Sequence, residues 1–259
     1  MSMTYIFHDG LEAFDTLQTF PAAASQHLPP TGGGTSQPPK IDRQCKAPVP
    51  GPGLIERPRL TEALARAHDA FAATLITGRA GTGKTCLAAH YASEAGKTAW
   101  MTLDTPDVDW NNFAAYLMAA VGGTKQLPAE LAETLPRPEA VDRALALAFG
   151  RTKSRLVVFD ELHKIFDAPW FGDLLAKIPA AVPVGTHVIL ISRTRPPGPF
   201  WRMRSKQVVN VIDENLLAFT REEASRLFKA FGRSQRRAAQ AHRESFGRAE
   251  TIARMVYKT

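Results

Sequence analysis

The eight residues from 78 to 85, GRAGTGKT, constrain the fold of this chain more than any other stretch. They follow the short apolar segment ATLIT and run into the helix-forming segment KTCLAAHYASEA, so the pattern G-x-x-x-x-G-K-[ST] stands between a strand and a helix. Gly78, Gly81 and Gly83 let the backbone curl until its N–H groups face a phosphate. The helix that begins near Lys84 directs the positive end of its dipole at the same anion. The sequence therefore predicts a phosphate-binding loop.

Three side chains at the end of this loop carry further expectations. Lys84 would reach the outer phosphates as a point charge, and the hydroxyl of Thr85 would be a ligand of Mg²⁺. A helix N-terminus can lower the pKa of a thiol, so Cys86 is either a reactive cysteine or a residue packed under the loop. The predicted phosphate-side contacts are Gly78, Arg79, Ala80, Gly81, Thr82, Gly83, Lys84, Thr85 and Cys86.

Apolar strands alternate with helices along the middle of the chain. Strands of this kind belong to a parallel sheet that is covered on both faces. The expected strands are 73–78, 98–103, 155–160, 187–192 and 207–212, and the expected helices between them are 59–71, 84–96, 110–123 and 138–150. We expect strand 155–160 to lie beside strand 73–78. The predicted fold is an α/β P-loop NTPase with a five-stranded, mostly parallel sheet between helices.

The two ends of the chain differ from this pattern. Residues 21–53 are rich in Pro, Gly and Ser and bury too little apolar surface to offset the entropy of ordering. At the other end, Thr220 and Glu223 form a capping box that opens a helix, and two more helical stretches follow. We expect a flexible segment (1–53), a P-loop core (54–215) and a small helical lid subdomain (216–259). Within the first segment, a short helix with Phe7, Leu11, Phe14 and Leu17 on one face competes with disorder.

Composition limits the classes of protein that fit. The net charge is +7, and residues 221–259 carry +6 of it from ten basic and four acidic residues. These charges are spread out with few aromatic residues, which favours a solvated helical face over nucleic-acid binding. Cys45 and Cys86 form neither a disulfide framework nor a metal-ligand pattern. Because no lysine or arginine precedes Lys40 and no apolar run could span a bilayer, we expect a cytoplasmic protein without membrane contact.

The segment LVVFDELHKIF, from 156 to 166, supplies acids at the end of a predicted strand. Asp160 would hold Mg²⁺, and Glu161 would orient or deprotonate an attacking water. His163 either contacts this site or only packs against the turn. Arg193, which follows strand 187–192, would report on a γ-phosphate or would be a surface arginine.

These segments, in this order, resemble the STAND class of P-loop ATPases, and in particular the nucleotide-binding domain of large LuxR-type transcriptional regulators. The resemblance covers about residues 54–257. It rests on LIERPRL with Arg57, GRAGTGKT, WMTLD with Trp100, Leu103 and Asp104, Asp160-Glu161-x-His163, Ser192-Arg193-x-x-Pro196, and LLAFTREEASRLF.

The resemblance implies ATP and Mg²⁺ as ligands, with adenine near residues 55–59 and with Arg57 among the nucleotide contacts. It also implies self-association with ATP and a closed monomer with ADP. Glu161 stands where the family usually has Asp. The family's winged-helix, sensor and helix-turn-helix parts are not found before Thr259, and we find no direct DNA-binding motif. We therefore expect a truncated, split or stand-alone member.

Three functions follow from these residues. The first is an ATP-binding regulatory switch with slow Mg²⁺-dependent hydrolysis, in which Lys84, Glu161 and Arg193 are the catalytic side chains. The second is an AAA+-type ATPase that assembles on DNA or protein and needs an arginine from a neighbouring copy, such as Arg202 or Arg204. The third is a nucleotide-binding scaffold that does not hydrolyse ATP.

Overall fold

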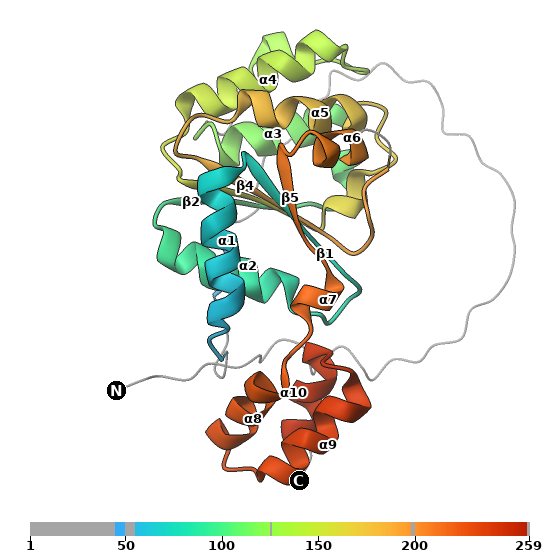
Figure 1. Ribbon diagram of the computed structural model, residues 1–259. Coiled ribbons are helices and arrows are strands. Elements are labelled where there is room, and N and C mark those ends of the chain that lie inside the picture. Colours follow the sequence, from blue (N-terminus) through green and yellow to red (C-terminus); the bar gives the residue numbers. More distant parts are fainter. Residues whose placement is uncertain (1–44, 50–54, 125, 198–199, 258–259) are drawn as a thin grey trace, which may run out of the picture.

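A computed structural model describes residues 45–49, 55–124, 126–197 and 200–257. The predicted amphipathic helix near the N-terminus lies outside the described residues, as does most of the expected flexible segment. The central feature is a sheet of five parallel strands in the order β2-β3-β4-β1-β5 (Figure 1). The prediction of a five-stranded sheet is confirmed. Its strands are β1 Ala73–Thr77, β2 Thr98–Thr102, β3 Leu156–Asp160, β4 His187–Ser192 and β5 Val209–Ile212.

One predicted neighbour relation is wrong. Strand β3 does not lie beside β1, because β4 pairs with both and separates them. Leu75 of β1 pairs with Leu190 of β4, while Val158 of β3 pairs with Ile189 of the same strand. All six residues of β4 are buried, which suits a strand covered on both faces and flanked on both sides. The carboxyl ends of the strands still share one edge, so β1 and β3 present their last residues to the same region.

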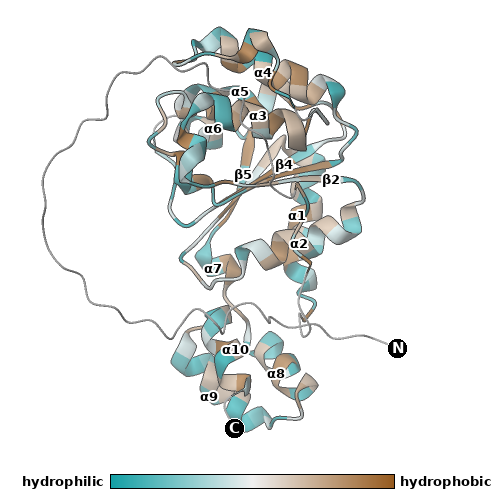
Figure 2. Cartoon of the chain, turned by 180° about the vertical axis from the view of Figure 1, so that it is seen from behind, coloured by the Kyte–Doolittle hydropathy of each residue, from teal (hydrophilic) through white to brown (hydrophobic). Residues whose placement is uncertain are grey.

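Helices cover both faces of the sheet, and the core forms two apolar layers. Helices α1 and α2 pack on one face, and α3, α4 and α5 pack on the other (Figure 1). Figure 2 shows hydrophobic strands between helices whose outer surfaces carry most of the hydrophilic residues. Helix α5 has no counterpart among the elements expected from the sequence. The helices are α1 Pro58–Ala70, α2 Lys84–Ala95, α3 Trp110–Ala120, α4 Pro138–Arg151, α5 Phe171–Ala181 and the short α6 Phe200–Ser205, with 3₁₀ turns η1 Thr105–Val108, η2 Ala129–Leu131 and η3 Leu162–Ile165.

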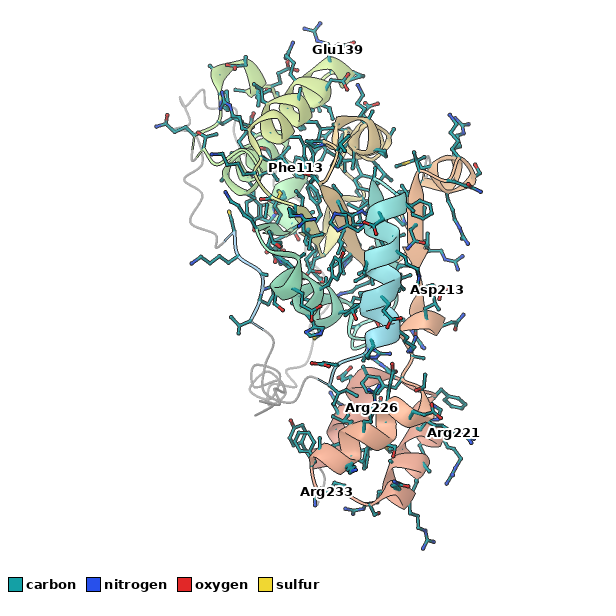
Figure 3. All side chains as sticks on the ribbon, turned by 60° about the vertical axis from the view of Figure 1, so that its left-hand side comes forward. Phe113, Glu139, Asp213, Arg221, Arg226 and Arg233 are labelled. Carbon is teal, nitrogen blue, oxygen red and sulfur yellow. The ribbon has the colours of Figure 1, made fainter. Side chains whose placement is uncertain are left out.

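Aromatic side chains fill the layer beneath α3. Phe113 is fully buried and lies between the ring of Phe159, at a centroid distance of 6.5 Å, and that of Trp170, at 4.6 Å (Figure 3). The indole N–H of Trp110 donates to the carbonyl of Leu131 at 2.8 Å, so its polar atom is satisfied inside the core. Phe159 directly precedes Asp160, so this aromatic cluster packs against the end of β3 where the acids of the site begin.

The last helices form a separate bundle, which we call the helical subdomain (α8–α10). Helix α7 Glu214–Leu217 leads from β5 into it, and Figure 1 shows the bundle beyond one edge of the sheet. The predicted capping box is present, because Thr220 accepts from the N–H of Glu223 and Glu223 accepts from the N–H of Thr220. Among the described residues, no helix combines the length and the apolar character needed to cross a membrane. The helices are α8 Arg221–Ala230, α9 Gln235–Ser245 and α10 Ala249–Tyr257, and their own apolar cluster comprises Phe219, Ala224, Leu227, Phe228, Ala238, Ala241, Ile252 and Val256.

A buried histidine makes the stability of the fold depend on pH. His187, at the start of β4, is wholly buried, and its Nδ1 donates to the carbonyl of Phe71 at 2.9 Å. Its Nε2, 3.0 Å from the Thr74 hydroxyl, therefore accepts and carries no proton. Burial lowers the pKa of His187 from 6.5 to about 4.

We predict that the free energy of unfolding falls by about 3 kcal/mol as the pH is lowered from 6.5 to 4, because the unfolded chain takes up the proton first. Urea denaturation at pH 7 and pH 4.5 would measure this loss. Asp160 contributes the opposite slope, since its pKa is raised, so the informative quantity is the difference between wild type and His187→Gln. His90→Gln, at a partly exposed histidine on α2, should leave the slope unchanged; an unchanged slope in His187→Gln would contradict the prediction.

Candidate functional site

The loop of residues 78–85 connects β1 to α2 and is closed by its own lysine. Gly81 and Gly83 have φ values of 76° and 86°, a left-handed conformation that glycine adopts at little cost. The Nζ of Lys84 donates to the carbonyls of Gly78 at 2.6 Å and Arg79 at 2.9 Å. Lys84 is only 6% exposed, and burial lowers its pKa. The loop therefore has the form of an anion-binding site, and the ammonium group of Lys84 is bound to carbonyls of the loop itself.

The side chains of Thr85 and Asp160, the two residues proposed from the sequence as ligands of Mg²⁺, lie next to each other at the carboxyl ends of the strands. The Thr85 hydroxyl lies 3.1 Å from Oδ2 of Asp160, and the N–H of Glu161 donates to Oδ1 at 2.9 Å. Asp160 is 3% exposed. Burial raises its pKa to about 6, against the lowering effect of these two hydrogen bonds. A buried carboxylate of this kind gains from a nearby cation.

Thr85 and Asp160 suit Mg²⁺, which needs few protein ligands, better than they suit a metal that is coordinated by protein side chains alone. Among the described residues, there is no group of three or more His, Cys, Asp or Glu side chains that could hold a metal. Mg²⁺ is commonly held by one or two protein oxygens together with water and substrate phosphates. Asp160 and Thr85 supply one carboxylate and one hydroxyl beside a phosphate-binding loop, which is the donor set that such a site requires.

Glu161 combines a left-handed backbone with a carboxylate that lies close to Arg193 and His163. Its backbone is left-handed, with φ 56° and ψ 34°, a conformation that costs a non-glycine residue about 1 kcal/mol or more. Its Oε2 lies 2.9 Å from the guanidinium of Arg193 and 3.6 Å from Nε2 of His163. The Nδ1 of His163 is buried without a hydrogen-bond partner, and burial lowers the pKa of this histidine. The predicted water-side acid and the predicted phosphate-reporting arginine are thus paired with each other.

Cys86 is packed beneath the loop. Burial raises the pKa of its thiol to about 12, and the nearby carboxylate of Asp160 adds to this rise. Since the thiolate is the reactive form, this thiol stays protonated at neutral pH. Of the two alternatives left open by the sequence, the structure favours packing over reactivity.

The arrangement was compared with known proteins. No sequence profile of a known protein family matches the chain. The Walker-type ATPase of Pyrococcus abyssi is similar in structure, with a TM-score of 0.52 and 13% identity over 78% of this chain and 67% of that chain. The chain has the fold of a P-loop NTPase. The Orc1 protein of Aeropyrum pernix, solved in complex with DNA, is more distant, with a TM-score of 0.44 and 20% identity over 75% of this chain and 55% of that one. At such identities, similarity shows the fold alone.

Sequence analysis missed a carboxylate at the start of the P-loop. Glu214, the first residue of α7, accepts hydrogen bonds from the backbone N–H of Arg79 at 3.1 Å and from its Nε at 2.9 Å. The hydrogen bond from Arg79 lowers the pKa of Glu214. Asp213 caps the same short helix, and Figure 3 places it between the sheet and the helical subdomain. No local pattern could have identified this contact, because 135 residues separate Glu214 from Arg79.

Two further residues reach the P-loop from the helical subdomain. Arg248 donates to the carbonyl of Ala80 at 2.7 Å, and the backbone N–H of Glu250 donates to the carbonyl of Gly81 at 2.9 Å. Both sit at the beginning of α10, far from the loop in sequence. The helical subdomain therefore contacts the tip of the P-loop directly.

Arg57 lies at the junction between the core and the helical subdomain. Its guanidinium donates to the carbonyls of Leu217 at 2.7 Å and Ala218 at 3.0 Å, pairs with Glu223 at 3.1 Å, and covers the ring of Phe219 at 4.3 Å. These contacts explain why an arginine is buried here. Its role as a nucleotide contact, implied by the family resemblance, stays a prediction.

Proposed function

We propose that this chain is an ATP-binding switch with slow, Mg²⁺-dependent hydrolysis. The observation that carries the proposal is the 2.9 Å pair between Glu161 and Arg193, beside a P-loop whose Lys84 is bound to its own carbonyls. In this arrangement, the side chains expected to act on the γ-phosphate and on water are engaged with protein groups. A bound nucleotide has to displace these contacts before hydrolysis can begin. This favours slow turnover and a structural difference between the nucleotide-free and the nucleotide-bound protein.

The loop would bind the phosphates through its backbone N–H groups and the N-terminus of α2. Lys84 would exchange the carbonyls of Gly78 and Arg79 for the outer phosphate oxygens. Thr85 and Asp160 would hold Mg²⁺, which neutralises phosphate charge when bound. The raised pKa of Asp160 supports this assignment, because a cation favours the ionised carboxylate that burial disfavours.

Arg193 and Glu161 would then separate. The guanidinium of Arg193 would turn to the γ-phosphate, which is a stronger partner than a single carboxylate. Glu161 would keep its place near His163 and would accept the proton of the attacking water. The left-handed backbone at Glu161 supports such a role, because strained conformations concentrate at functional positions.

The regulatory part of the proposal rests on the resemblance to LuxR-type regulators of the STAND class. We propose that the nucleotide state controls self-association or the binding of a protein partner. Residues 216–259 would act as a lid, since α8–α10 have their own apolar cluster and touch the P-loop. Size-exclusion chromatography with light scattering in ATP and in ADP would test this; identical masses in both would contradict nucleotide-controlled self-association.

The first test is the affinity for nucleotide. We predict that Lys84→Ala raises the Kd for ATP by about 10- to 100-fold, because hydrogen bonds to charged groups contribute about 1.5–3 kcal/mol. Titration with a fluorescent ATP analogue in the presence of Mg²⁺ would measure it. Lys97→Ala, at an exposed lysine just after α2, should bind like wild type. Equal affinity in the Lys84 variant, or no binding by wild type, would contradict the proposed function.

An AAA+-type assembly is the alternative. Arg202 and Arg204 lie exposed on α6, which follows β4 and the Arg193 turn. If a neighbouring copy used one of them, turnover would rise steeply with protein concentration and would fall in the corresponding alanine variant. Turnover independent of protein concentration would favour the switch.

A further inference from the structure

The beginning of α10 rests on the tip of the P-loop through two hydrogen bonds. Both acceptors are loop carbonyls, Ala80 for Arg248 and Gly81 for the N–H of Glu250. They directly follow Gly78 and Arg79, whose carbonyls bind Lys84. Four consecutive loop carbonyls are therefore occupied, two by the lysine and two by the helical subdomain.

The side chain of Glu250 is wedged between this loop and two arginines. Its Oε1 lies 2.7 Å from Arg254 and its Oε2 lies 3.3 Å from Arg248. A Cβ placed on Gly81 would come within 2.0 Å of Glu250 Oε2, so only a glycine leaves room for this carboxylate. The Nε of Arg248 is buried without a hydrogen-bond partner, although the side chain as a whole is 38% exposed.

The helical subdomain is also tied to the core at a second place, away from the loop. Glu223 of α8 binds two arginines at the start of α1 in the core, Arg57 at 3.1 Å and Arg59 at 2.9 Å. This junction would hold the subdomain in place even if the contact with the loop opened. The contacts of Glu223 with Arg57 and Arg59 thus involve different residues from the hydrogen bonds that α10 makes with the loop.

We propose that Arg248 and Glu250 form a latch that closes the helical subdomain over the P-loop and slows the entry and release of nucleotide. The inference rests on the proposed function. When Lys84 moves from the carbonyls of Gly78 and Arg79 to a phosphate, these two carbonyls shift. The next two carbonyls, Ala80 and Gly81, which bind the latch, then shift as well. The nucleotide also brings negative charge toward the Glu250 carboxylate, which its two arginines partly neutralise. Nucleotide occupancy and latch closure are therefore coupled, and the coupling is reciprocal.

Stopped-flow fluorescence with a fluorescent ATP analogue tests the latch on the full chain. Arg248→Ala removes the side-chain hydrogen bond to Ala80 and should raise the association and dissociation rate constants by about tenfold each, with a much smaller change in Kd, because opening a closed site accelerates both directions. Glu250→Gln keeps the size and the backbone hydrogen bond but loses the ion pairs, so it should show a smaller increase. Glu244→Ala, at an exposed acid on α9, should match wild type. Unchanged rate constants in both the Arg248→Ala and the Glu250→Gln variants would overturn the latch.

A measurement without nucleotide separates failure of the latch from failure of the proposed function. Amide hydrogen exchange in peptides that span residues 78–83 should be faster in Arg248→Ala than in Glu244→Ala, since the loop loses the hydrogen bond from Arg248 to the carbonyl of Ala80. Equal exchange in the two variants would overturn the latch whatever the loop binds. If wild type binds no nucleotide, the proposed function fails, and the exchange experiment still decides whether the contact exists.

Discussion

Replacement of Glu161 by glutamine is expected to lower the rate of ATP hydrolysis by about 10²- to 10⁴-fold, the usual contribution of a positioned general base. Glutamine has nearly the same size as glutamate but cannot accept a proton from water. ATP binding should persist, because the predicted phosphate and Mg²⁺ contacts come from residues 78–85 and from Asp160. Phosphate release under single-turnover conditions, beside an equilibrium titration with a fluorescent ATP analogue, would measure the two quantities separately.

A matched control makes this result specific. Glu139 lies on α4, remote from the P-loop (Figure 3). Glu139→Gln makes the same chemical change and should leave both hydrolysis and binding at the wild-type level. Equal hydrolysis by Glu161→Gln and wild type would remove Glu161 from the mechanism and would favour the non-hydrolysing scaffold. A loss of binding together with hydrolysis would instead assign Glu161 to the nucleotide contacts.

The P-loop and its acids could be predicted because their signals are local. A strand, a glycine loop and a helix start must be contiguous in sequence to form an anion cradle, so GRAGTGKT specifies its own structure. The same holds for β3, whose apolar run ends at Asp160. Sheet periodicity also predicted five strands. The neighbour of β1 could not be predicted, because strand order depends on which helices cover each face rather than on any one segment.

The contacts that join distant segments carry no local signal. Glu214 and Arg248 reach the loop from 135 and 168 residues away, and the sequence around each of them contains no motif that points to the loop. Glu223 shows a further limit. The capping box predicted its place at the start of α8 correctly, yet the same carboxylate also binds Arg57 and Arg59. The capping-box pattern accounts for the role of Glu223 at the start of α8 and carries no information about its ion pairs with Arg57 and Arg59.

The ion pairs of Glu223 with Arg57 and Arg59 predict that the loss of this carboxylate has a large effect on stability. Glu223 is 3% exposed and Arg57 is 8% exposed, and they pair at 3.1 Å. Burial alone would raise the pKa of Glu223, but hydrogen bonds from Arg59 and Thr220 and the charge of Arg57 bring it below its ordinary value. Its stabilising contribution is therefore present above pH 4.5, the ordinary value, and is lost as the pH falls below it.

We predict that Glu223→Ala lowers the free energy of unfolding by about 3–5 kcal/mol at neutral pH, because it leaves the buried guanidinium of Arg57 without its carboxylate and removes half of the capping box. Urea denaturation would measure this change. Glu222→Ala, at the exposed neighbouring acid on the same helix turn, is the matched control and should cost less than about 0.5 kcal/mol.

A double-mutant cycle identifies the cause of the loss. If the loss comes from the unpaired arginine, the Arg57→Ala and Glu223→Ala double variant should be more stable than the sum of the two single losses predicts, since the second substitution removes a charge that the first left unpaired. Strict additivity would show that Glu223 acts through its helix cap and through Arg59 rather than through Arg57. In that case, the junction between the core and the helical subdomain would depend on the remaining contacts of Arg57 with the carbonyls of Leu217 and Ala218.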